Sequence, residues 1–230
     1  MIAAVARRLH RLPWATLALG LACVALFVAT GFEAEPHSSA AHQRWGWRSA
    51  SDIRAGDYWA LFTSNLLHSS AAHLALNLVW LGLLGSAVER SFGALRWLVF
   101  VPIAAVVSAG VELHLADEVG VGISGVVFAA FGLLLVSPGE RSYLTGRPFA
   151  VIGVIFACWL AFDVWRFASQ WMAHQHLRGI PSTAHIAGFL VGVATGCGAR
   201  WLRRRSTEAG ASTSQRQTSA PSPHRGRRGR

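Results

Sequence analysis

Long runs of apolar residues constrain this chain more than any other feature. A helix rises about 1.5 Å per residue, so roughly 20 apolar residues are needed to cross ~30 Å of hydrocarbon. Hydrophobic residues make up 53% of the 230 residues and charged residues only 14%, a balance that is rare in soluble domains. The sequence therefore predicts an all-α membrane protein with six transmembrane helices, near residues 13–32, 71–89, 95–113, 120–137, 149–167 and 181–202.

Arginine supplies all 21 basic side chains, and its distribution predicts the orientation. It is concentrated before the first run, between the second and third, between the fourth and fifth, and after the sixth, so both termini are expected in the cytoplasm. We expect a multi-pass plasma-membrane protein with a cytoplasmic N-terminus at residues 1–12 and a membrane domain at 13–202. The outer loop at 33–70 is expected to pack on the membrane surface, and 203–230 to form a disordered, basic cytoplasmic tail.

The net charge of +10 raises the question of nucleic-acid binding. Nine of the arginines lie in residues 200–230, beside the predicted membrane domain, which favours attraction to anionic lipid headgroups over RNA. The expected partners are the lipid bilayer and transmembrane protein substrates, with no nucleic acid. We expect no cofactor and no metal. No disulfide framework is indicated, because all three cysteines lie inside apolar runs.

Polar residues near the outer ends of three runs are the candidate functional residues. The second, fourth and sixth runs enter from the outer face, so Ser124, His185 and Asn77, each early in its run, lie at similar depth. His73 lies one turn above Asn77, and His68 lies in the loop just before. Since polar side chains are costly in hydrocarbon unless they face the bundle interior, their shared depth predicts one common polar pocket.

Each of these features also has a purely structural interpretation. A lone serine in a membrane helix usually bonds a carbonyl one turn back. Gly188, Gly192 and Gly196 form a stripe at four-residue spacing that most often serves helix packing. The structural and the functional interpretation are compatible if this stripe faces the glycine-rich start of the fourth run. The two backbones then approach closely enough for His185 to reach Ser124.

Three short motifs carry a family resemblance. They are "HSSAAHLALN" in the second run, "GISG" in the fourth and "AHIAGFLVG" in the sixth, and "SAVERSFG" after the second run is similar to an E-x-x-x-G turn. With these motifs in this order, the chain resembles the rhomboid intramembrane serine proteases over about residues 13–202. The resemblance implies a rhomboid-like six-helix bundle with Ser124 as nucleophile, His185 as general base, His73 and Asn77 as oxyanion donors, and His68, Gly122, Gly125, Phe128 and Gly188 in support.

No carboxylate stands in the expected place to orient His185. Asp163 lies one turn from Arg166 and is expected to form an ion pair with it. We therefore expect a Ser-His dyad, in which packing by Phe128 and neighbouring glycines fixes the imidazole. The other carboxylates considered are two on the cytoplasmic side and one at the end of the third run, Glu89, Glu140 and Glu112.

The outer loop departs from the resemblance at one position. The family commonly has Trp-Arg before the first histidine motif, whereas Trp59 is followed here by Ala60. Arg48 or Arg54 is a candidate to replace the missing anchor, and we expect a less rigid loop with the catalytic groups intact.

The predicted function is that of an intramembrane serine endopeptidase that cleaves transmembrane segments of other membrane proteins near the outer face. The alternative is a proteolytically inactive rhomboid-like protein that binds membrane helices, whose signature would be a missing serine or histidine. A channel or transporter would spread polar groups across the membrane depth, whereas these groups gather near one face. Substrate identity and oligomeric state are not encoded in a recognisable motif.

Overall fold

The computed structural model describes residues 12–31, 40–137, 147–173 and 182–218, and within them every regular element is helical. The expected N-terminal segment 1–12 thus lies outside the described residues except for its last residue. The elements are α2 (Trp14–Ala29), α3 (Ala40–Trp45), α4 (Ala50–Ala55), α5 (Ala60–Thr63), η1 (Ser64–Leu66), α6 (Ala71–Trp80), η2 (Leu81–Gly85), α7 (Ser86–Phe92), α8 (Ala94–Ala116), α9 (Ser124–Val136), α10 (Arg147–Met172) and α11 (Ser182–Thr218).

All six predicted runs are apolar helices in the structure. Four stretches are long and apolar enough to cross a membrane, judged by length and composition: Ala71–Phe92, Ala94–Ala116, Phe149–Met172 and Ser182–Leu202. The other two runs correspond to the shorter apolar helices α2 and α9. The described residues therefore form an all-α bundle with the long apolar helices of a membrane protein, and the count of six complete spans stays a prediction.

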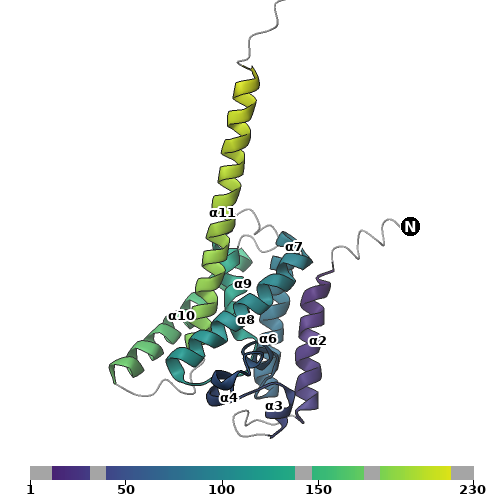
Figure 1. The fold of residues 1–230 in the computed structure, drawn as a ribbon, viewed down its shortest axis with the longest axis vertical. Helices are drawn as coiled ribbons and strands as arrows, with labels where there is room; N and C mark the ends of the chain where they lie inside the picture. The colour runs from purple at the N-terminus through teal and green to yellow at the C-terminus, as the bar shows by residue number, and fades with distance from the viewer. Residues whose placement is uncertain (1–11, 32–39, 138–146, 174–181, 219–230) are drawn as a thin grey trace, which may run out of the picture.

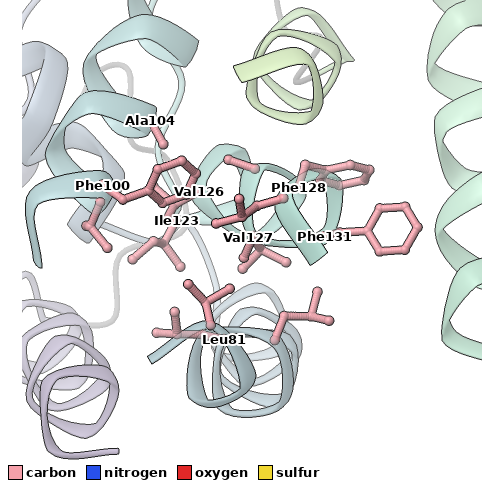
Figure 2. Close-up of a cluster of buried hydrophobic side chains, with 14 of the residues drawn as sticks. Leu81, Phe100, Ala104, Ile123, Val126, Val127, Phe128 and Phe131 are labelled. Atoms are coloured by element: carbon pink, nitrogen blue, oxygen red, sulfur yellow. The ribbon is translucent and has the colours of Figure 1, made fainter. Parts of the chain in front are cut away.

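Helix α9 forms the centre of the bundle. Every residue from Gly125 to Leu134 is buried, because helices surround α9 and leave its apolar surface no lipid to face. α2 and α10 lie on opposite sides of the bundle (Figure 1). Side chains of α9 pack against Leu81 of η2 and against Phe100 and Ala104 of α8 (Figure 2). The helix that begins with Ser124 is thus held in place from several directions.

Glycines allow the backbones of α11 and α9 to pack in direct contact. A Cβ atom placed on Gly188 would lie 2.1 Å from the carbonyl oxygen of Gly125, and one on Gly192 would lie 2.0 Å from that of Ala129. No larger side chain fits at these separations. Gly188, the first glycine of the stripe, thus faces the start of the fourth run, which is the condition under which His185 can reach Ser124.

Glu89, in the predicted E-x-x-x-G turn, ties α7 to the start of α2. Its carboxylate is 5% exposed and accepts hydrogen bonds from the backbone N–H groups of Ala15 at 3.0 Å and Thr16 at 2.8 Å, and from the Thr16 hydroxyl at 2.7 Å. The first N–H groups of a helix lack intrahelical acceptors, and a negative charge is favourable there. Glu89 therefore caps α2, which has no cap from its own N-cap residue, Pro13.

Arginines anchor the outer loop despite the missing Trp-Arg pair. Arg48 forms an ion pair with Asp57 at 2.9 Å, and its guanidinium lies 4.8 Å from the centroid of the Trp59 ring. Arg54 forms an ion pair with Asp117, beyond the end of α8. Arg48 thus joins two parts of the loop, and Arg54 joins the loop to the end of α8.

The outer loop also contacts the segment that leads into α9. Ala60 is completely buried in a small apolar cluster with Ile53, Ala109 and Val119. The Trp47 indole N–H donates to the Val119 carbonyl at 2.8 Å, and the backbone N–H of Gly122 donates to the Ser64 carbonyl at 3.3 Å. The loop therefore positions the residues immediately before Ser124.

Helix α11 is longer than the sequence predicts. The predicted disordered tail starts at residue 203, whereas the helix continues to Thr218 and extends well beyond the other helices (Figure 1). The arginine, glutamate, alanine and glutamine residues of this stretch favour helix, and extending an existing helix requires no new nucleus. The remainder of the predicted tail, 219–230, lies outside the described residues.

Candidate active site

Ser124 is the first residue of α9. Gly122, two residues earlier, has φ +118°, a backbone conformation that residues with a Cβ rarely adopt. The helix therefore begins at Ser124, whereas the hydropathy pattern predicted four further residues before it. The first backbone N–H groups of α9 have no helical acceptor, and the helix dipole favours negative charge at this end.

The structure brings Ser124 and His185 together. The Nε2 atom of His185, in the first turn of α11, lies 2.9 Å from the Ser124 hydroxyl oxygen. His185 is only 3% exposed. A Cβ on Gly125 would lie 3.0 Å from the Ser108 hydroxyl, so Gly125 and Gly188 together create the space in which this contact forms.

Aromatic side chains hold the imidazole of His185. The Phe128 ring, one turn after Ser124, stacks on it with centroids 4.4 Å apart and planes inclined by 14°. Trp159 of α10 contacts it edge to face, with centroids 5.7 Å apart and planes inclined by 88°. The expected contact with Phe128 is present, while the contact from Trp159 was not predicted.

Asp163 does not form the ion pair with Arg166 that its spacing predicted. Its Oδ2 atom lies 2.8 Å from Nδ1 of His185, and its Oδ1 atom accepts a hydrogen bond from the Ser182 hydroxyl at 2.8 Å. The Arg166 guanidinium lies instead 5.8 Å from the centroid of the Phe162 ring. The expectation that no carboxylate reaches His185 is wrong, because Asp163 faces the bundle interior.

His73 and Asn77 converge on Gly122. A Cβ atom on Gly122 would lie 2.8 Å from His73 Nε2 and 3.5 Å from Asn77 Nδ2, so both groups lie next to the segment that carries Ser124. The Ser69 hydroxyl lies 3.1 Å from His73 Nδ1. When that hydroxyl donates, the imidazole proton resides on Nε2 and faces the site.

His68 supports His73 from the loop before α6. It is 1% exposed, and its ring lies 5.1 Å from that of His73, edge to face. Burial, together with the nearby His73 ring, lowers the pKa of His68 from 6.5 to about 4. His68 is therefore neutral at physiological pH.

A small cavity of about 20 Å³ adjoins Ser124, which is large enough for about one water molecule. Among the described residues, no group of three histidine, cysteine or acidic side chains is placed to hold a metal ion. The cavity is lined by Asn65, Ala109, Glu112, Gly120, Val121, Gly122, Ser124, Gly125 and Ala184.

Comparisons with known proteins point to one family. The family model of the Rhomboid domain matches residues 55–201, a range that contains Ser124, His185 and Asp163. The chain is similar to the rhomboid protease GlpG of Salmonella paratyphi A (strain ATCC 9150 / SARB42), with 34% identity over 140 residues. The match covers 60% of this chain and 47% of that relative, so the chain spans about half of the relative's length.

Proposed function

The chain belongs to the rhomboid family, and from this premise we propose that it is an intramembrane serine endopeptidase acting on transmembrane segments of other membrane proteins. The observation that carries the proposal is the 2.9 Å contact between the Ser124 hydroxyl and Nε2 of His185. A neutral serine is a weak nucleophile, and a base at hydrogen-bond distance is what activates it.

The reaction proceeds through an acyl-enzyme. As the Ser124 oxygen bonds to the scissile carbonyl carbon, its proton passes to Nε2 of His185, which then gives it to the leaving amine as the C–N bond breaks. Water adds to the acyl carbon and loses a proton to the same nitrogen. That proton returns to the Ser124 oxygen when the new carboxyl group leaves.

The negative charge of the tetrahedral intermediate needs donors that are already in place. We infer that the side chains of Asn77 and His73, which lie beside Gly122, are two of these donors. The backbone N–H groups at the start of α9 are the others. Replacing Asn77 by alanine should reduce the acylation rate on the order of 10²- to 10³-fold, the loss typical of one oxyanion donor.

We infer that the site lies near the outer face, where water and an unwound substrate can meet. A folded helix has all its backbone bonds satisfied, so the substrate must unwind locally to expose its carbonyl groups. We infer a plasma-membrane protein with both termini in the cytoplasm, an orientation that the arginine distribution supports. The cavity beside Ser124 offers a position for the hydrolytic water.

A fluorophosphonate probe tests the proposal on the full chain in detergent micelles. Wild type should be labelled, and Ser124→Ala and His185→Ala should not. Ser169→Ala is the matched control, since the Ser169 hydroxyl bonds the carbonyl of Arg166 in its own helix. Absence of Ser124-dependent labelling in a folded preparation would favour a proteolytically inactive rhomboid-like protein that binds membrane helices.

A further inference from the structure

The catalytic histidine has a hydrogen-bond partner on each ring nitrogen. Nε2 lies 2.9 Å from the Ser124 hydroxyl and Nδ1 lies 2.8 Å from Oδ2 of Asp163. We propose that Asp163 is a positioning residue for His185, so that the protein works through a Ser-His-Asp arrangement. This inference rests on the proposed protease function and concerns the same site.

Asp163 is held as a fixed acceptor. It is 2% exposed, and an ionised carboxylate at such burial is strongly disfavoured unless donors surround it. Both of its oxygens have one: the Ser182 hydroxyl donates to Oδ1, and Nδ1 of His185 faces Oδ2. Two donors on different oxygens fix the plane of the carboxylate as well as its position.

A carboxylate at Nδ1 selects the tautomer that catalysis requires. With its proton on Nδ1, donated to Asp163, His185 presents the Nε2 lone pair to the Ser124 hydroxyl. After proton transfer the imidazolium keeps its Nδ1 proton, and the adjacent carboxylate stabilises the positive charge without itself taking the proton. Removing the carboxylate leaves the base in place and lets the ring adopt the wrong tautomer.

Helix α10 therefore contributes twice to the orientation of His185. Trp159 and Asp163 lie four residues apart, on one face of α10. The Trp159 ring packs nearly perpendicular to the imidazole, and Oδ2 of Asp163 lies beside Nδ1. Arg166, one turn further, contacts the Phe162 ring and is partly exposed. It provides a charged control position on the same helix.

The test compares Asp163→Asn with Arg166→Gln in the full chain. The first readout is the rate constant for fluorophosphonate labelling of Ser124. We expect a loss of about 10²- to 10⁴-fold in Asp163→Asn, the upper value being that seen when the triad carboxylate of trypsin is replaced by asparagine. Arg166→Gln should label at the wild-type rate.

The second readout is the ¹⁵N NMR signal of the His185 imidazole in histidine-labelled protein, assigned with His185→Ala. Wild type should show the Nδ1–H tautomer, and Asp163→Asn should shift the signals toward the other tautomer. A merely structural role of Asp163 would not move this equilibrium in a folded protein. A loss in labelling below tenfold, or an unchanged tautomer, would overturn the inference.

Two further arms keep the test decisive. If Asp163→Asn does not fold, Ser182→Ala removes one donor to the carboxylate and should slow labelling at least threefold while moving the His185 signals; no change in either would overturn the inference. If wild type is not labelled at all, the proposed protease function fails. The NMR comparison then still decides whether Asp163 sets the tautomer of His185.

Discussion

Replacing Gly188 by alanine should separate the catalytic serine and histidine. The added Cβ atom would lie 2.1 Å from the Gly125 carbonyl oxygen, and such a contact needs at least about 3.0 Å. The opposing atom belongs to backbone inside a buried helix, so α9 and α11 must move apart by about 0.9 Å at this point.

That displacement is large compared with the tolerance of the hydrogen bond. Gly188 lies one turn from His185, and Gly125 directly follows Ser124, so the gap opens between the reacting groups. The 2.9 Å distance between Nε2 and the hydroxyl would approach about 3.8 Å, beyond hydrogen-bonding range. A misplacement of about 1 Å can cost on the order of 10² in rate, and overpacking a core costs about 1–3 kcal/mol in stability.

The assay is the rate constant for fluorophosphonate labelling, with thermal unfolding in detergent measured in parallel. Gly198→Ala is the matched control, because it lies on the same helix and a Cβ there would meet nothing within 4 Å. It should label normally and be slightly stabilised, since alanine favours helix over glycine. If Gly188→Ala also labelled at the wild-type rate, the backbone contact would not set the Ser124–His185 distance.

Three further predictions concern Phe128, Glu89 and His68. Phe128→Leu should slow labelling by roughly threefold to tenfold, because an aromatic contact on the His185 ring contributes about 0.5–1.5 kcal/mol; an equal rate would mean that the ring is fixed without it. Glu89→Gln should lower the unfolding free energy by about 2 kcal/mol in a denaturant titration, because charged hydrogen bonds to α2 are weakened, while the labelling rate of the folded protein stays unchanged. The pKa of His68 is about 4 in the folded protein, below its unfolded value of 6.5, so the unfolded chain binds the extra proton and the unfolding temperature should fall as pH drops from 6.5 to 4. His68→Gln should flatten that part of the pH dependence, and an unaltered slope would assign it to other groups.

The sequence predicted the meeting of Ser124 and His185 because local patterns specify it. The glycine stripe dictates which face of the sixth run can approach another backbone, and the motif spacing places the histidine one turn from the first of these glycines. The start of α9 was harder to predict, because the residues around Gly122 are apolar and hydropathy does not distinguish an unwound segment from a helix.

The role of Asp163 was missed because two pairings fit the same sequence. Arg166 lies three residues away on a helix, a spacing that allows an ion pair, whereas the contact with His185 depends on how α10 is rotated against α11. One feature of the sequence does indicate the contact between Asp163 and His185. An acidic residue within an apolar run is costly unless it faces the bundle interior, and a buried carboxylate in a bundle that also buries a histidine has that histidine as a natural partner.

The geometry of His185 depends on two interfaces of different kinds, and this difference allows their roles to be separated. The contact with Ser124 is set by backbone packing between α9 and α11, where glycines leave no room for adjustment. The contact with Asp163 is made by side chains of α10, so a displacement of α10 would remove the carboxylate from Nδ1 and leave Nε2 beside the serine. Changes in the glycine contact should therefore lower stability and rate together, whereas Asp163→Asn should lower the rate far more than the stability. If Asp163→Asn lowered the labelling rate and the stability by the same free energy, α10 would serve as structural support for α11. The carboxylate would then have no separate part in orienting the base.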